Sequence, residues 1–132
     1  MIKNNPSFRT PQDLPIIQKL IVAYKLWHDC YSHFGKLYRF GIGLQIDGLF
    51  METIKNVFTA IHKPRDQKHS YLNKASDSFD LLKFILQVAW ETKALDDKKY
   101  IALSQYLSEI GRMLGGWQKT TALHVVRTVE QR

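Results

Sequence analysis

The sequence predicts an all-α protein, an antiparallel up-down-up-down four-helix bundle that assembles as a homo-oligomer. Three observations support this fold class. Apolar residues recur at spacings of three and four in four separate segments, as they do on one face of a helix. Short turns join the segments, which favours antiparallel neighbours. With 132 residues and 45% hydrophobic content, the chain has the size and composition of one folded domain.

The first predicted helix covers residues 14–34. Asp13 can cap its beginning, and Pro15 is tolerated there because the N–H group that proline lacks would have no helical partner in a first turn. Gly35 is typical of the position just after a helix end. The face predicted to point inward carries Ile17, Leu20, Tyr24, Trp27, Tyr31 and Phe34.

The second predicted helix runs from about residue 39 to residue 62, before Pro64. Gly41, Gly43 and Gly48 each destabilise a helix interior by up to ~1 kcal/mol relative to alanine. They indicate either places where another helix comes close or a later helix start near Leu44. The predicted inward face carries Ile46, Phe50, Ile54, Val57 and Ile61.

Residues 62–70, HKPRDQKHS, predict a polar and basic loop before a third helix over residues 71–92. The inward face of that helix carries Leu72, Ala75, Phe79, Leu82, Leu86 and Ala89. Leu81, Ile85 and Val88 form a second apolar stripe beside it. Either burial against another subunit or a central, well-buried helix would explain such a wide apolar face.

The fourth predicted helix covers residues 100–117 and follows Asp96 or Asp97 as a cap. Gly115 and Gly116 weaken this helix and therefore predict that another backbone or side chain comes close. Arg112 lies off the apolar stripe, where it either interacts with the carbonyls of the last turn or contacts a subunit or a nucleic acid. The inward face carries Tyr100, Leu103, Leu107, Ile110, Leu114 and Trp117.

The predicted organisation is a lead-in over residues 1–13, a bundle over residues 14–119 and a C-terminal tail over residues 120–132. The lead-in is polar with two prolines, and the tail has β-branched residues without a sustained stripe, so we expect both to be flexible. In an up-down-up-down bundle, the loop between the second and third helices lies at the same end as both termini.

The chain is basic, with 19 Lys and Arg against 12 Asp and Glu, a formal charge of +7 and a pI near 9.6. Such a balance is typical of nucleic-acid-binding proteins, although a plain basic surface also produces it. The candidate nucleic-acid-binding residues are Lys63, Arg65, Lys68, His69, Lys74 and Arg39. The candidate interface residues are Leu81, Ile85, Val88, Trp90 and Arg112.

The sequence offers little for catalysis. None of its glutamates has a histidine three residues on, as carboxylate-bridged di-metal bundles require. His28, Cys30 and His33 point in different directions on a helix, which argues against a metal site. We therefore expect no enzymatic activity, no cofactor and no metal. The single cysteine, and the lack of an N-terminal signal sequence or a membrane-spanning apolar run, predict a cytoplasmic protein.

Residues 109–117, EIGRMLGGW, resemble the accessory variability protein (Avd) of diversity-generating retroelements. Avd belongs to a wider group of small bacterial four-helix-bundle proteins, which includes the protein encoded in intervening sequences of large-subunit ribosomal RNA genes. The similarity extends to LIVAYKLWHDCY, to the glycine-bearing start of the second helix and to SYLNKASDSFDLLKFILQVAWETKAL. It covers about residues 14–119, and IGRMLGGW is its most distinctive piece.

This resemblance implies a homopentamer of bundles arranged as a barrel with a basic surface. It implies association with a retroelement reverse transcriptase and its RNA template during mutagenic copying, without catalytic activity of the protein itself. DNA or an RNA–DNA hybrid are alternative ligands. The alternative hypothesis is a structural or protein-interaction module whose basic residues form only a soluble surface. Asp66 interrupts the basic loop, which leaves the location of the RNA surface open.

Overall fold

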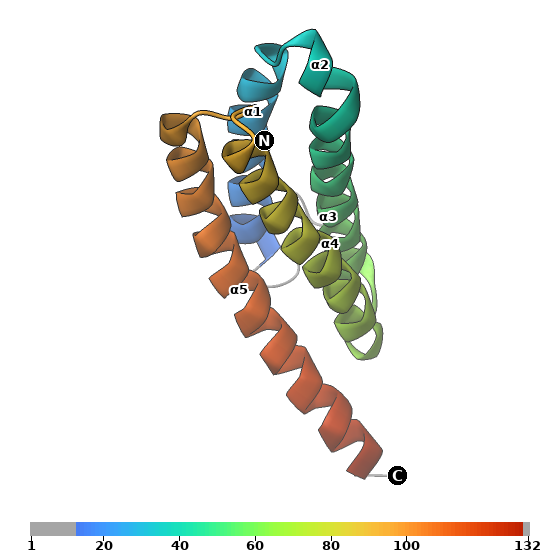
Figure 1. Cartoon of the computed structure of the whole chain (residues 1–132). Coiled ribbons are helices and arrows are strands. Elements are labelled where there is room, and N and C mark those ends of the chain that lie inside the picture. The colour runs from blue at the N-terminus through green and yellow to red at the C-terminus, as the bar shows by residue number, and fades with distance from the viewer. Residues whose placement is uncertain (1–12, 131–132) are drawn as a thin grey trace.

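The structure, a computed structural model, describes residues 13–130, with side chains described over residues 15–123. The predicted four-helix all-α fold is confirmed, and the described residues contain no strand (Figure 1). Residues 1–12, which make up nearly all of the predicted lead-in, lie outside the described residues. The elements in chain order are α1 (Asp13–Ser32), α2 (Lys36–Tyr38), the π-helical turn η2 (Arg39–Gly43), α3 (Leu44–His62), α4 (Arg65–Glu91) and α5 (Asp97–Glu130).

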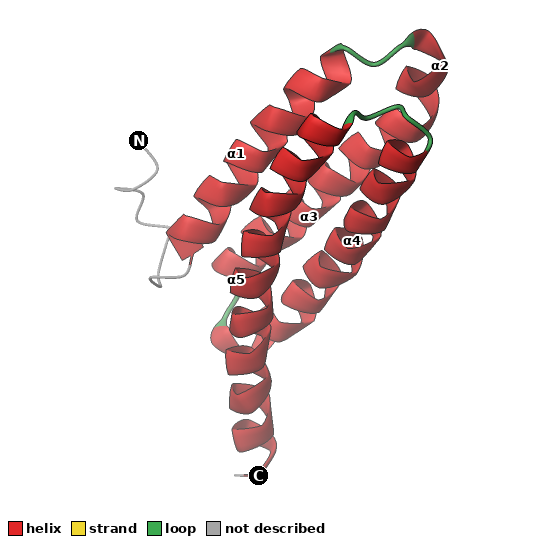
Figure 2. Ribbon diagram, turned by 60° about the vertical axis from the view of Figure 1, so that its left-hand side comes forward, coloured by secondary structure: helices red, strands yellow, loops and turns green. Residues whose placement is uncertain are grey.

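The four long helices alternate in direction and enclose one core. Helix α1 packs against α3 and α5, and α4 packs against the same two helices. Figure 2 shows the α3–α4 turn at the end of the bundle where α1 begins, and α5 continuing past that end. The α1–α2 and α4–α5 turns lie together at the opposite end. The predicted up-down-up-down order is therefore confirmed.

The core consists of the predicted inward faces, with a few differences. All predicted inward residues of the third helix are buried, and so are those of the fourth except the partly buried Tyr100. Tyr24, Tyr31 and Ile54 are also only partly buried. The sequence reading missed Ile16, Ala23 and Cys30, which are at most 2% exposed. Helix α1 contacts two neighbouring helices, so it buries a wider arc than one stripe of residues covers.

A shared carboxylate connects α1 to α3. Asp47 Oδ1 accepts hydrogen bonds from the Tyr24 hydroxyl at 2.8 Å and from the Trp27 indole Nε1 at 3.1 Å. Burial, followed by the hydrogen bond and negative charge of Asp47, raises the pKa of Tyr24 to about 12. Trp27 is fully buried and stacks on Phe50. These contacts satisfy the polar tips of both rings while their apolar bodies fill the core.

The entry into α3 depends on one close approach at Gly43. A Cβ atom on Gly43 would lie 2.7 Å from Tyr31 Cε1, well inside the normal carbon–carbon contact distance. Gly41 and Gly48 have open space where their Cβ atoms would be. The predicted close approach is therefore confirmed for Gly43 and wrong for Gly41 and Gly48. The α-helix α3 begins at Leu44, as the alternative prediction had it, although α2 and η2 precede it.

Two predicted element boundaries are wrong. Residues 62–70 do not form a loop, because α4 begins at Arg65 and only Lys63 and Pro64 separate it from α3. An extended proline directly before the first helical residue is enough to reverse the chain here. Helix α5 does not end near Trp117 but continues to Glu130. The β-branched residues of this segment lower helix propensity only slightly, and that does not end the helix.

The α4–α5 turn is fixed by backbone and side-chain hydrogen bonds. Lys93 has a φ of 68°, the left-handed conformation that commonly terminates helices. The backbone N–H groups of Ala94 and Leu95 donate to the Ala89 carbonyl at 2.9 and 3.1 Å. Across the turn, Trp90 Nε1 donates to Asp97 Oδ1 at 2.7 Å. The turn therefore fixes where α5 begins.

Candidate nucleic-acid interface

Two lysines flank one aromatic ring at the α3–α4 turn. The Nζ atom of Lys63 lies 5.3 Å from the centroid of the Tyr71 ring, and the Nζ atom of Lys74 lies 4.8 Å from it. Lys63 belongs to the turn, whereas Tyr71 and Lys74 lie one helical turn apart on α4. The π electrons of the ring attract both ammonium groups, so the side chains of both lysines gather around Tyr71. We call Lys63, Tyr71 and Lys74 the Tyr71 cluster.

Lys68 has a different environment from the one that the sequence predicts. It is only 7% exposed, and its Nζ donates to the carbonyl oxygens of Ala60 at 2.8 Å and Ile61 at 2.9 Å. These carbonyls belong to the last turn of α3, where helical partners are missing. The Trp117 ring lies 5.9 Å from the same ammonium. Lys68 therefore caps α3, which corrects its assignment to a solvent-facing basic loop.

The other two predicted nucleic-acid-binding residues at this end, Arg65 and His69, differ in exposure. Arg65 is exposed at the start of α4, at the same end of the bundle as the Tyr71 cluster. His69 is partly buried, and its Nδ1 lies 2.9 Å from Thr121 Oγ1 of α5. One turn on, Gln118 Nε2 donates to Asn73 Oδ1 at 3.0 Å. His69 therefore contributes to the α4–α5 contact.

Arg39 lies away from the other predicted nucleic-acid-binding residues. It begins η2 beside the α1–α2 turn, at the opposite end of the bundle from the α3–α4 turn (Figure 2). Its Nη2 donates to the Ser32 carbonyl at 3.2 Å, and its own carbonyl accepts from the Tyr31 hydroxyl at 3.0 Å. The structure thus brings Lys63 and Lys74 together and leaves Arg39 apart.

The predicted interface residues on α4 differ in exposure. Leu81 is 49% exposed, whereas Ile85 and Val88 are partly buried. Trp90 is also partly buried, and its ring stacks on Tyr100 with centroids 4.6 Å apart. The Trp90 indole is thus engaged within the chain, through this stacking and its hydrogen bond to Asp97. The sequence reading missed Phe84, which is 58% exposed beside Leu81.

A second exposed apolar surface, along α2, η2 and α3, was also missed. The signal that could have revealed it is a seven-residue spacing, which places side chains on nearly the same side of a helix. The predicted inward face of this segment accounts for only one stripe of its apolar residues. We call this set the α3 stripe: Leu37 (83% exposed), Phe40 (70%), Leu44 (56%), Met51 (45%) and Phe58 (54%).

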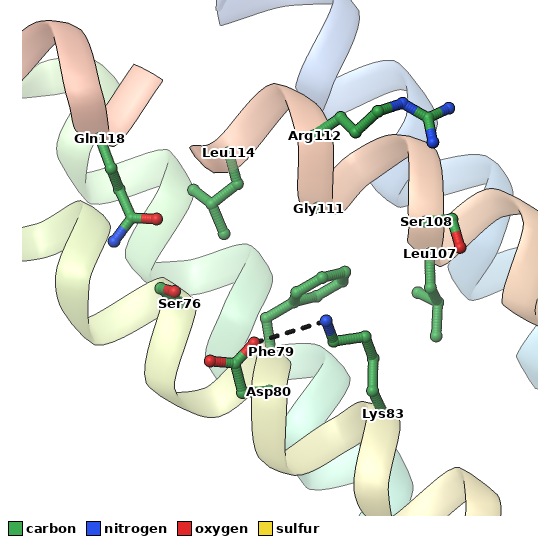
Figure 3. A pocket seen from close by; sticks show the side chains of 10 residues that line it. All are labelled: Ser76, Phe79, Asp80, Lys83, Leu107, Ser108, Gly111, Arg112, Leu114 and Gln118. Atoms are coloured by element: carbon green, nitrogen blue, oxygen red, sulfur yellow. Dashed lines mark ion pairs between the residues drawn. The ribbon is translucent and has the colours of Figure 1, made fainter. Parts of the chain in front are cut away.

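A groove runs between α4 and α5, with a hollow of about 360 Å³ that Figure 3 shows from close by. Residues with short side chains or none, Ser76, Ser108 and Gly111, are among those that line it. Lys83 Nζ lies 3.5 Å from Asp80 Oδ1 on one wall. A neighbouring hollow of about 440 Å³ shares Lys83 and Ser108 with it. Neither hollow has a His or Cys among its described lining residues, so neither holds a nucleophile paired with an imidazole base.

The motif residues of α5 lie on or beside this groove. Arg112 is exposed, lines the groove and extends away from Asp80 in Figure 3. It lies in the middle of α5, so the predicted role at the last turn of the helix is wrong. Gly115 and Gly116 face open space, and the close approach predicted for them does not occur within the described chain.

The described residues contain no group of three His, Cys, Asp or Glu side chains that could hold a metal ion. Cys30 is buried, and burial raises the pKa of its thiol, which disfavours the reactive thiolate. Over the same part of the chain, no helix combines the length and the apolar content needed to cross a membrane.

The family assignment comes from sequence comparison. No curated protein and no solved structure gives a significant match to the chain. A family model described as bAvd-like matches residues 15–121. This match begins in the first turn of α1 and ends at Thr121, whose hydroxyl contacts His69. It thus covers the bundle from α1 to the His69–Thr121 contact between α4 and α5, and the chain belongs to the bAvd-like family.

Proposed function

We propose that this protein is a non-catalytic accessory subunit that associates with a retroelement reverse transcriptase and binds its RNA template during mutagenic reverse transcription. The observation that carries the proposal is the bAvd-like family match over residues 15–121. The resemblance of EIGRMLGGW to Avd supplies the retroelement context. DNA and RNA–DNA hybrids offer the same phosphates and are alternative ligands.

The distribution of charge supports nucleic-acid binding. The chain has a net charge of +7, and the ion pairs in its described part involve only Lys19, Lys55 and Lys83. Lys63 and Lys74 of the Tyr71 cluster are therefore not neutralised by a carboxylate there. A cation that contacts a phosphate releases a condensed counterion, which makes binding favourable and dependent on salt. We infer that the Tyr71 cluster, with Arg65 at the same end, contacts the phosphate backbone.

The test is a filter-binding titration of the folded protein with structured RNA at rising salt. We expect affinity to fall steeply with salt concentration. The double variant Lys63→Ala/Lys74→Ala should bind more weakly and lower the magnitude of the slope of log affinity against log salt by about 1.4 to 1.8, since each phosphate contact contributes about 0.7 on single strands and about 0.9 on a B-form duplex. Wild-type affinity that does not respond to salt, or no affinity at low salt, would contradict the proposal.

A matched control removes the same charge elsewhere. Lys25 on α1 and Lys98 near the start of α5 are exposed and have no ion pair within the described residues. Lys25→Ala/Lys98→Ala should therefore leave the salt slope closer to wild type than the Lys63→Ala/Lys74→Ala variant does. Equal losses in both double variants would mean that only the net charge matters, and not the Tyr71 cluster.

The proposal assigns no catalysis to this chain. The only cysteine is buried with a raised thiol pKa, and the α4–α5 groove offers an Asp80–Lys83 ion pair and serine hydroxyls. These groups lack an oriented base that would activate a serine. Elemental analysis of the purified protein tests the related expectation of no bound metal, and a stoichiometric transition metal would revive an enzymatic role.

The second candidate function is a protein-interaction module without nucleic-acid binding. The exposure of Phe40 and Met51 on one side of the bundle and of Phe84 on another favours it, because exposed apolar patches mark protein interfaces. Reversing the charge of Lys63 and Arg65 separates the two functions. Under the module hypothesis, the wild type already binds no RNA, and partner binding survives this reversal. Lys68 is excluded from the reversal because it caps α3.

We also propose that the protein associates with itself, and the resemblance to Avd implies a pentamer. The exposed apolar residues of α4, Leu81 and Phe84, support an interface on this helix. Light scattering of the full chain tests self-association directly, and a folded wild-type monomer at micromolar concentration would end this part of the proposal.

A further inference from the structure

Two exposed apolar stripes lie on different helices of the chain. The three members of the α3 stripe that lie on α3 itself, Leu44, Met51 and Phe58, follow one another at intervals of seven residues. The second, which we call the α4 stripe, consists of the exposed Leu81 and Phe84 and the partly buried Val88, at intervals of three and four. Both spacings are those of the seam between two helices that pack knobs into holes. Each stripe therefore fits a helix as its partner.

The two stripes lie on different sides of the bundle. Phe40 and Leu44 of the α3 stripe line a hollow together with Tyr31 of α1, so this stripe borders α1. Phe84 of the α4 stripe lines the groove between α4 and α5, so the α4 stripe borders α5. Helices α1 and α5 both lie beside the core, yet neither covers the exposed side chains. Within the described residues, a single copy thus leaves both stripes open.

The charges beside the two stripes are complementary. The α3 stripe is flanked by Lys36 and Arg39, and its only neighbouring exposed acid, Glu52, pairs with Lys55 at 3.7 Å. The α4 stripe is flanked by the exposed acids Asp77 and Glu91, which lie seven residues before and after Phe84. Its nearest lysine, Lys83, pairs with Asp80. Opposite charges beside a helix seam select the partner and its orientation.

We infer that the α3 stripe of one copy binds the α4 stripe of a second copy. This inference rests on the proposed self-association and specifies its two faces. Because the two faces differ, the contact is head-to-tail, and an open assembly keeps one free face of each kind, at its two ends, until it closes into a ring. Basic residues beside one stripe meet acidic residues beside the other, which an α3–α3 or α4–α4 contact would not achieve.

The test is a complementation experiment with two variants of the full chain. Met51→Glu/Phe58→Glu removes the apolar character of the α3 stripe, and Leu81→Glu/Phe84→Glu removes that of the α4 stripe. All four side chains are at least 45% exposed, so both variants should keep the helix content of the wild type by circular dichroism. We expect each variant alone to be monomeric by light scattering, because neither can form the mixed contact with itself.

Mixing the two variants in equal amounts should give a species of twice the monomer mass and nothing larger. Each copy then has one intact face of the required kind, and the pair leaves no intact face for growth. Assembly of either variant alone to the wild-type size would overturn the inference, because it would show a contact between identical faces. A mixture that stays monomeric, or a monomeric wild type, would overturn it as well.

The failure of this inference can be told apart from failure of the proposed function. Salt-dependent RNA binding depends on Lys63 and Lys74, which both variants retain. If the wild type binds RNA and assembles but complementation fails, only the assignment of the faces is wrong. If the wild type neither binds RNA nor assembles, the proposed function fails with it.

Discussion

The ammonium group of Lys68 lies 2.8 Å from the carbonyl oxygen of Ala60, so a buried cation on α4 satisfies the end of α3. We predict that Lys68→Met destabilises the fold by about 1.5–3 kcal/mol, the range for hydrogen bonds to charged groups. The measurement is urea denaturation followed by circular dichroism. Arg65→Met, at an exposed site one turn earlier, is the control and should change stability by less than about 0.5 kcal/mol. Equal effects would show that the capping bond contributes nothing.

From the burial of the Tyr24 hydroxyl and its hydrogen bond to Asp47 we predict that the fold loses stability in alkaline solution. The folded-state pKa of Tyr24 is raised to about 12, above the usual value of 10.0. A raised tyrosine pKa means that the neutral hydroxyl is favoured in the fold, so this stabilisation is complete below pH 10 and is lost between pH 10 and 12. Asp47→Ala should lower the pKa of Tyr24, as followed by ultraviolet absorbance. Burial remains in that variant and should hold the value above the usual one. An unchanged titration would contradict the assignment.

We predict that replacing Lys93 with glycine stabilises the fold. Its φ of 68° is unfavourable for residues with a Cβ atom and natural for glycine. Lys93→Gly should therefore raise the free energy of unfolding by about 1 kcal/mol, as measured by denaturant titration. Lys25→Gly, at an exposed position inside α1, should lower it by about the same amount. If both variants are destabilised, the left-handed conformation is not a source of strain.

Gly43 and Gly48 form a matched pair near the beginning of α3. Alanine at Gly43 would place a Cβ atom 2.7 Å from the Tyr31 ring, so we expect a loss of about 1–3 kcal/mol as the ring is displaced. Alanine at Gly48 meets open space and should stabilise the helix by about 0.5–1 kcal/mol. Thermal unfolding of the two variants gives the comparison, and equal shifts in midpoint would contradict it.

We predict that replacing Gly115 and Gly116 affects the stability of the fold and its intermolecular contacts in different ways. Both face open space inside a helix, so Gly115→Ala/Gly116→Ala should raise the stability of the isolated chain by about 1–2 kcal/mol. The same variant tests whether another molecule approaches α5 at this point. Light scattering and the RNA titration provide the readouts. A stabilised variant that has lost assembly or RNA affinity would show that the glycines serve an intermolecular contact.

The sequence by itself determined the four helices and most of the core. Leu103, Leu107, Ile110 and Leu114 are buried as predicted, because helical spacing decides which residues share a face. The bundle order also followed from short turns. The basic end of the bundle was predicted through Lys63 and Arg65, whose positive charge does not depend on packing.

Tertiary structure decided how individual polar and glycine residues are used. Lys68 caps α3 because Pro64 reverses the chain within two residues, which brings the first turns of α4 beside the carbonyls of α3. Gly43 meets Tyr31 while Gly48 does not, because Gly43 is buried against α1 and Gly48 is exposed. Periodicity gives the direction of a side chain relative to its own helix. The identity of the neighbour depends on the packing of helices far apart in the chain.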